Sequence, residues 1–244
     1  MKKLLKRCTV ISLFLAFISV NGYAVPVTLM LDVEAESSNP GTVWASVPIY
    51  TGIDWNTVYA NPDTTYTWYL PMSEQFEIRA NNHPEIVLAT VTGINISVKA
   101  DPIIEIGFAV AAGSLKTYFS FTSDVLSFAP MTNPDAFAYA YVVPNRGDTV
   151  IGNFEYGTKA YRAVYNGTGV FANLVGTATG PMQTYEETGW QQIPGTVSSI
   201  QSQWWFSLSA NGLATGSASF EIVPEPATIS LLAIGAIALL RKRK

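Results

Sequence analysis

The stretch AFAYAYVV, from Ala136 to Val143, decides the fold class. Its side chains alternate in character from one residue to the next, and a period of two is that of a β-strand, in which successive side chains point to opposite faces. The same alternation recurs along the chain, in Val25–Val33, Val43–Tyr50, Thr65–Leu70, Gln75–Ala80, Ile86–Val91, Ile94–Lys99, Ile103–Ala111, Lys116–Phe121, Ala160–Tyr165, Gly169–Val175, Trp204–Ser209 and Ser217–Ile222.

Turn-forming residues separate these segments. Asn166-Gly167 and Asn211-Gly212 can supply the positive φ that a tight hairpin turn requires. Helical spacing is weak outside two apolar runs at the ends of the chain. We therefore predict an all-β fold, an antiparallel β-sandwich of the jelly-roll kind, formed as one domain by residues 25–222.

Composition and charge limit the classes of partner that the chain can bind. The chain has 244 residues, 48% of them hydrophobic and only 13% charged, about half the usual charged share. With a mean hydropathy of +0.22 it is too apolar to be disordered. Residues 32–225 hold six basic and 18 acidic residues, a net charge of −12. Phosphate binding requires basic clusters, so a nucleic-acid partner is excluded. An acidic body instead attracts cations such as calcium.

The first 24 residues have the order of an export signal. Basic residues precede an apolar run from Val10 to Val20, and Gly22 and Ala24 place small residues before a cleavage site between Ala24 and Val25. The alternative is a membrane anchor, but the run is shorter than the roughly 20 residues that a span needs. Cleavage removes Cys8, the one cysteine. The mature chain then has no disulfide, thiol nucleophile or Cys-ligated zinc.

The last 22 residues have three parts. Pro224, Glu225 and Pro226 precede an apolar run, Ala227–Leu240, and the chain ends in four basic residues, Arg241, Lys242, Arg243 and Lys244. A helix over the run would be about 21 Å long, marginal for a permanent span of the hydrocarbon core. The basic end stays on the cytoplasmic side, which places the preceding domain outside. A simple C-terminal anchor is the alternative interpretation.

This ending resembles the PEP-CTERM sorting signal of Gram-negative bacteria that make exopolysaccharide. The resemblance implies that an exosortase of the inner membrane recognises the tail and cleaves near the motif. Before that, the Sec translocon would export the chain and signal peptidase would remove the N-terminal signal. It implies transient anchoring in the inner membrane and a destination at the cell surface or in the extracellular, biofilm-associated matrix. The resemblance concerns sorting and says nothing about activity, because many unrelated exported domains carry this C-terminal tail.

Residues suited to catalysis are sparse. His83 is the one histidine, lies in a turn-like stretch, and is the only base available to a Ser-His-Asp triad; no Gly-x-Ser-x-Gly elbow accompanies it. One histidine cannot build a multi-histidine zinc site. Glycoside hydrolysis needs two converging carboxylates. The candidates are Glu74, Glu77, Glu105, Glu155, Glu186 and Glu187.

Two kinds of binding site remain open. Asp32, Glu34 and Glu36 alternate along one segment, so they share a face that could hold a calcium ion with help from elsewhere. Exposed aromatic rings stack on sugar rings. Trp204 and Trp205 must face opposite ways on one strand, and Trp55 lies in a loop-like stretch; these three are the candidate glycan-binding residues. No cofactor is expected, calcium being the one ion that the acidic residues suggest.

Three functions follow from these patterns. The first is a non-enzymatic surface or matrix protein, favoured by the export signals, the acidic body and the lack of a catalytic constellation. The second is a carbohydrate-binding module that uses exposed aromatics and has polysaccharide as its partner. The third is a glycan-active enzyme with paired carboxylates. A structure that shows an aromatic groove, or two carboxylates roughly 5–10 Å apart in a cleft, distinguishes among them.

Overall fold

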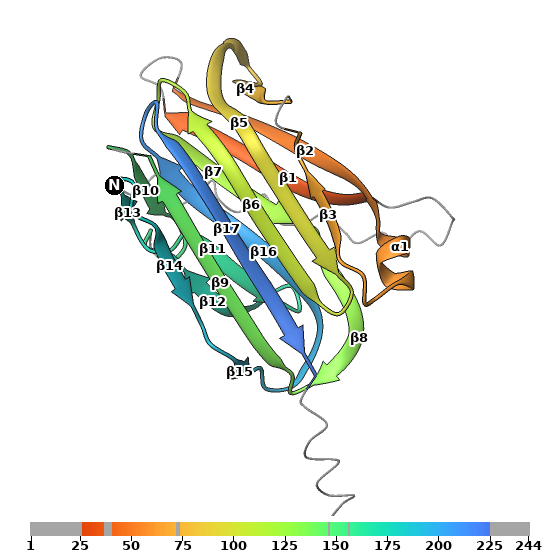
Figure 1. The fold of residues 1–244 in the computed structure, drawn as a ribbon. Coiled ribbons are helices and arrows are strands. Elements are labelled where there is room, and N and C mark those ends of the chain that lie inside the picture. Colours follow the sequence, from red (N-terminus) through yellow and green to blue (C-terminus); the bar gives the residue numbers. More distant parts are fainter. Residues whose placement is uncertain (1–25, 37–40, 72–73, 146, 156, 225–244) are drawn as a thin grey trace, which may run out of the picture.

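The computed structural model describes residues 26–36, 41–71, 74–145, 147–155 and 157–224. They form two antiparallel sheets that lie one over the other as a β-sandwich (Figure 1), which confirms the predicted fold class. Within this part of the chain one short helix accompanies the strands, α1 (Trp55–Ala60). Among the same residues there is no helix whose length and apolar character would let it cross a membrane.

The first sheet, called sheet A here, runs in the order β12-β11-β16-β7-β1-β2, with β8, β10 and β13 at its margins. Its strands are β1 (Pro26–Glu36), β2 (Thr42–Asp54), β7 (Thr117–Ser123), β8 (Leu126–Thr132), β10 (Thr149–Gly152), β11 (Tyr161–Tyr165), β12 (Gly169–Leu174), β13 (Ala178–Thr179) and β16 (Thr196–Leu208).

The second sheet, sheet B, runs in the order β14-β9-β17-β6-β5-β3, with β4 and β15 beside it. Its strands are β3 (Tyr66–Tyr69), β4 (Phe76–Ala80), β5 (His83–Lys99), β6 (Ile103–Ala112), β9 (Asp135–Pro144), β14 (Thr184–Glu187), β15 (Gln191–Gln192) and β17 (Leu213–Val223). The chain crosses between the sheets repeatedly, as from β16 to β17, so each sheet is assembled from distant parts of the sequence (Figure 1).

An aromatic cluster joins the two sheets. Phe108 of β6 lies 5.1 Å from Phe121 of β7, 5.1 Å from Trp204 and 5.0 Å from Phe206 of β16, measured between ring centroids. The Phe108 ring also lies close to the backbone of β17 at Gly216. A Cβ atom on Gly216 would lie 2.6 Å from this ring, so a glycine is needed there. Burial of these rings removes a large apolar area from water and stabilises the packing of the two sheets.

Strand β9, the stretch that decides the fold class, has its small residues inside. Ala136, Ala138, Ala140 and Val142 are buried, whereas Phe137, Tyr139 and Tyr141 lie half-buried on the outer face. Sheet B therefore presents a row of rings to the outside, which is unusual because large apolar groups most often fill a core.

The two Asn-Gly pairs behave differently. Asn166 and Gly167 have φ values of 48° and 74°, and they connect β11 to β12 in the predicted hairpin. Asn211 also has a positive φ, 57°. However, Asn211-Gly212 connects β16 to β17, which belong to different sheets, so the prediction of a hairpin there was wrong. This turn carries the chain from one layer of the sandwich to the other.

Candidate functional site

The outer face of sheet A is hollowed between two tryptophans. Alternation along β1 places Asp32 and Glu34 outside, and alternation along β2 does the same for Trp44 and Ser46. Glu34 pairs with Trp44 across the β1–β2 ladder, and Asp32 pairs with Ser46. The sequence therefore builds one half of the hollow from a single hairpin.

Strands β7 and β16 build the other half. Ser120 pairs with Asp32 on one side and with Trp205 on the other, and Tyr118 pairs with Glu34. One row of residues thus crosses four strands, from Ser46 through Asp32 and Ser120 to Trp205. The hollow has a volume of about 520 Å³. We call it the Trp44–Trp205 hollow; its polar lining is Asp32, Glu34, Thr42, Ser46, Tyr118 and Ser120.

Both tryptophans are accessible. Trp44 is 49% exposed and Trp205 is 39% exposed. Trp205 is held in place by Phe154, whose ring meets it edge-on at a centroid distance of 5.6 Å. The guanidinium carbon of Arg162 lies 4.1 Å from the centroid of the Phe154 ring. Trp205 therefore has a packed support, which lowers the entropy cost of binding a ligand against it.

The charge in the hollow is negative. The pKa of Glu34 is raised by partial desolvation and, to a lesser extent, by repulsion from Glu36, although much of the Glu34 side chain stays exposed. Within the described residues, no group of three or more His, Cys, Asp or Glu side chains is arranged to hold a metal ion. Asp32, Glu34 and Glu36 share the outer face as expected, but the structure gives no support to calcium binding there.

Two of the three tryptophans predicted as glycan-binding residues are buried, which corrects the prediction for both. Trp204 is 0% exposed, and its ring packs against Phe108 and Tyr161 in the core. Trp55 is 8% exposed and begins helix α1; its Nε1 donates to Asp124 at 3.3 Å and its ring stacks on Tyr59. Neither presents a ring face on which a sugar could stack. Trp205 is the candidate that lies at the surface.

The predicted catalytic residues are dispersed. His83 begins β5, and its Nδ1 lies 3.1 Å from Glu85 Oε1 rather than beside a serine. Lys159 Nζ donates to Glu186 at 2.6 Å, Asn173 Nδ2 to Glu155 at 2.6 Å, and Arg79 to Glu77. Tyr185 donates to Glu187. None of the glutamates proposed for glycoside hydrolysis, Glu74 and Glu105 included, lines the Trp44–Trp205 hollow.

Trp44 was not among the glycan-binding residues predicted from the sequence. The sequence did contain an indication of its position. The segment from Val43 to Tyr50 was predicted as a strand, and Trp44 is two residues from Ser46, so both side chains point to the same face of that strand. A tryptophan on the polar face of a half-buried strand is the pattern expected of an exposed binding residue. The pairing of Trp44 with Glu34 fixes it at the rim of the hollow.

Half-buried glutamates give stability a pH dependence. Burial raises the pKa of Glu105 above its ordinary value, as it does that of Glu221. The folded state thus holds these protons more tightly than the unfolded state, and stability falls as the pH rises through the raised values. We expect Glu105→Gln to raise the melting temperature at pH 7 and to leave it nearly unchanged at pH 4.

Thermal unfolding followed by circular dichroism at both pH values measures this effect. Glu85→Gln is the matched control, because hydrogen bonds from the backbone and from His83 lower the pKa of Glu85. That variant should gain no stability at pH 7. Equal melting temperatures for Glu105→Gln and the wild type at pH 7 would refute the assignment of a desolvated carboxylate.

The described strands define the class of fold, an antiparallel β-sandwich, and the last of them, β17, ends at Val223. Residues 223–244 match the family model of the PEP-CTERM protein-sorting motif. The predicted resemblance is confirmed, and the protein is an exported bacterial protein of the cell surface or extracellular space that an exosortase sorts.

Of the predicted sorting residues, Pro224 lies within the part of the chain that the structure describes. Pro224 is exposed and directly follows β17. Glu225, Pro226, the run Ala227–Leu240 and the basic tail lie outside the described residues, as do the signal segment and its cleavage residues Ala24 and Val25.

Two solved structures are similar to the chain at low sequence identity. The chain resembles the C-terminal CBM6 of LamC, a marine laminarinase from Zobellia galactanivorans, with 7% identity over 64% of this chain and 99% of that one and a TM-score of 0.20. It also resembles the protein of infectious bursal virus derived T=1 particles, with 10% identity over 83% of this chain and 65% of that one and a TM-score of 0.18. No curated protein sequence matches the chain.

Proposed function

We propose that this protein is a non-catalytic component of the cell surface or extracellular matrix that binds uncharged polysaccharide in the Trp44–Trp205 hollow. The observation that carries the proposal is the pair of accessible tryptophans at one polar hollow. Exposed apolar surface rimmed by polar residues is typical of ligand-binding grooves. Sugar rings provide an apolar face for stacking and hydroxyl groups at the rim.

The polar lining suits sugar hydroxyls. Asp32 and Glu34 accept hydrogen bonds when ionised, and Ser46 and Ser120 can both donate and accept. Hydrogen bonds to charged acceptors are stronger than those between neutral groups. The same carboxylates repel uronic acids and other anionic sugars. An uncharged chain is therefore the ligand that fits both the rings and the charge.

The arrangement of the carboxylates favours binding over hydrolysis. The two catalytic carboxyl groups of a glycosidase flank the scissile bond from opposite sides. Asp32 and Glu34 instead stand two residues apart on one strand, β1, with their side chains on the same face. They would approach a bound glycan from one side. This supports a non-catalytic role.

The sorting motif supports the proposed location. The order of signal segment, body, motif, apolar run and basic end fits a Gram-negative exporter in which residues 1–24 are removed, the tail from 223 to 244 anchors the chain briefly in the inner membrane, and residues 25–222 are delivered outside. A protein delivered this way meets the polysaccharide of the surface and matrix, including exopolysaccharide in a biofilm.

Alanine variants test the hollow. We expect Trp44→Ala and Trp205→Ala each to weaken binding by about tenfold, because an aromatic stacking contact contributes roughly 1–1.5 kcal/mol. Affinity electrophoresis in gels that contain hydroxyethylcellulose, xylan, galactomannan or β-1,3-glucan measures the change, with alginate as the anionic comparison.

Tyr50→Ala is the control variant. Tyr50 is exposed on the same strand as Trp44 but does not line the hollow, so retardation of this variant should match that of the wild type. Unchanged retardation of both tryptophan variants, or a wild type that only alginate retards, would count against the proposal.

A further inference from the structure

The opposite face of the sandwich also has aromatic rings around a low polar floor. One row of paired residues crosses six strands of sheet B. It contains Tyr69 of β3, Asn95 of β5, Gly107 of β6, Ser217 of β17, Tyr141 of β9 and Tyr185 of β14. Tyrosines stand at both ends and short or polar residues lie between them. Tyr69 and Tyr141 are four strand spacings apart, about 19 Å.

The floor of this row is kept low by glycine. A Cβ atom on Gly107 would lie 2.0 Å from Oδ1 of Asn95, so the Asn95 side chain occupies the space above Gly107. In the next row a Cβ on Gly93 would lie 3.3 Å from the Cβ of Ala109. The Asn95 side chain makes no hydrogen bond to another residue of the described ranges, which leaves its amide available to a ligand.

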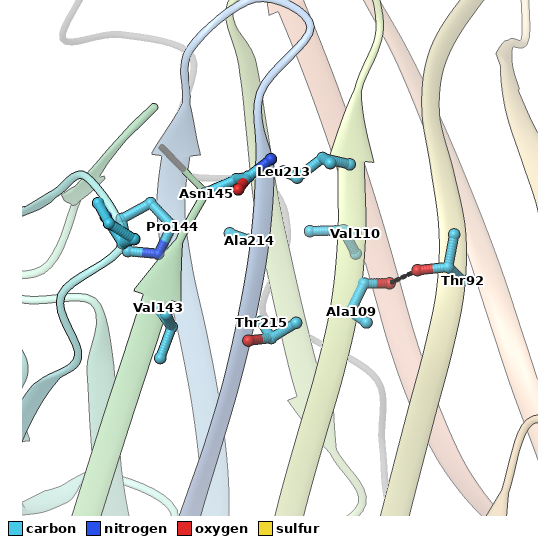
Figure 2. A pocket seen from close by; sticks show the side chains of 10 residues that line it. Thr92, Ala109, Val110, Val143, Pro144, Asn145, Leu213, Ala214 and Thr215 are labelled. Atoms are coloured by element: carbon cyan, nitrogen blue, oxygen red, sulfur yellow. Dashed lines mark hydrogen bonds between the residues drawn. The ribbon is translucent and has the colours of Figure 1, made fainter. Parts of the chain in front are cut away.

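Two hollows join over this floor. The first, of about 590 Å³, is lined by Tyr69, Asn95, Tyr141 and Ser217. The second, of about 420 Å³, lies farther along the strands and is shown in Figure 2. Thr92, Ala109 and Thr215 line both hollows, so they form one continuous depression, which we call the sheet B trough. Thr92 donates a hydrogen bond to the Ala109 carbonyl on its floor (Figure 2).

Rings and carboxylates border the trough. The Tyr139 and Tyr185 rings lie 6.2 Å apart, and Phe137 lies 5.4 Å from Trp190, which extends the aromatic surface along the β9 side. In the row beside Gly107 and Ser217 stand Glu105 and Ser219. Glu187 pairs with Tyr139 in the same row. The border is thus aromatic and acidic, which suits hydroxyl donors on an uncharged chain and disfavours anionic sugars.

We propose that the sheet B trough is a second polysaccharide-binding site, which takes an uncharged glycan chain between Tyr69 and Tyr141. The Trp44–Trp205 hollow and the trough lie on the two outer faces of one sandwich, so a single molecule holds two chains and cross-links them. The cross-linking, though not the binding in the trough, rests on the proposed function of the hollow. Two sites on one rigid body also raise the avidity for a polysaccharide network.

The test separates binding from bridging. Plates coated with one of the four uncharged polysaccharides capture the full protein, and a fluorescent soluble form of the same polysaccharide then reports whether a second chain is held. The variants are the double substitution Tyr69→Ala with Tyr141→Ala in the trough, Trp205→Ala in the hollow, and the triple combination, with Tyr50→Ala as the control. Circular dichroism confirms folding, and Tyr69 is 68% exposed, so its loss leaves the core intact.

We expect the wild type and Tyr50→Ala to bind and bridge. The trough variant and the hollow variant should each be captured but lose bridging by tenfold or more, and the triple variant should lose capture. Bridging by the trough variant at the wild-type level would overturn the second site and leave the hollow standing. Capture without bridging by the wild type and by Trp205→Ala alike, with capture lost in the trough variant, would overturn the hollow and leave the trough. A wild type that captures none of the four polysaccharides would overturn both.

Discussion

Replacement of Trp204 by alanine is expected to lower the free energy of unfolding by about 3–5 kcal/mol, the range typical for removing a large buried aromatic side chain. Trp204 is completely buried, and its ring contacts rings from both layers: Phe108 of sheet B at 5.1 Å and Tyr161 of sheet A at 5.2 Å. The cavity left behind cannot collapse easily, because strands on both sides of the sandwich hold its walls apart. Urea denaturation followed by tryptophan fluorescence and circular dichroism measures the loss.

The neighbouring residue provides the matched control. Trp205 has the same side chain on the same strand, but it points outward. Among the aromatic rings of the described residues, its ring contacts that of Phe154 only. Trp205→Ala should therefore cost only about 1 kcal/mol. Equal losses for the two variants, or the larger loss for Trp205→Ala, would mean that the register of β16 is displaced by one residue and its two faces are exchanged.

Alternation made most of the sandwich predictable from the sequence. Segments such as Ala136–Val143 and Ile103–Ala111 coincide with β9 and β6 to within a residue or so, because both faces of these strands have a strong side-chain pattern. The segments Ile86–Val91 and Ile94–Lys99 turned out to be parts of one long strand, β5, which is irregular in its pairing between Val91 and Gly93.

Elements without a clear alternation were missed. The first half of β16, from Thr196 to Gln203, is polar and reads as a loop. It is nevertheless part of the sheet, and Ser202 is buried there with its polar groups satisfied by Tyr161 and Ser123. Strand β8 contains Pro130, which cannot donate to a ladder, and its pairing with β16 is interrupted. The short helix α1 was interpreted as a loop, although Asp54 caps it by accepting from the Asn56 backbone amide.

The candidate site was less predictable than the fold, because it depends on which strands become neighbours. Trp44 and Glu34 meet through a local hairpin, but Trp205 reaches the same hollow only because β16 pairs with β7 and β7 with β1. Nothing in a single sequence specifies these long-range pairings. The alternation of side chains along each strand shows that Trp44 and Trp205 can face outward. Only the strand order shows that they border one hollow.

Sorting should respond to changes at the C-terminus in an all-or-none manner. We expect removal of Arg241–Lys244, or the substitution Glu225→Ala, to leave the exported precursor unprocessed in the inner membrane. The basic residues are expected to hold the end of the chain on the cytoplasmic side, and Glu225 stands between Pro224 and Pro226 within the matched segment 223–244. Cell fractionation with an antibody to the sandwich, followed by mass spectrometry of the released protein, measures the fraction that is processed.

The last strand supplies the control for this prediction. Glu221 lies on the outer face of β17, four residues before Glu225 in the sequence. Glu221→Ala therefore removes a carboxylate without touching the motif, and this variant should be processed normally. Released protein that still ends in Arg241–Lys244 would refute cleavage of the tail. Val223 still pairs with Asp135, and Pro224 follows it exposed. The sheet therefore ends where the matched segment begins, so removal of the residues after Pro224 would leave every described strand of the sandwich with its partner.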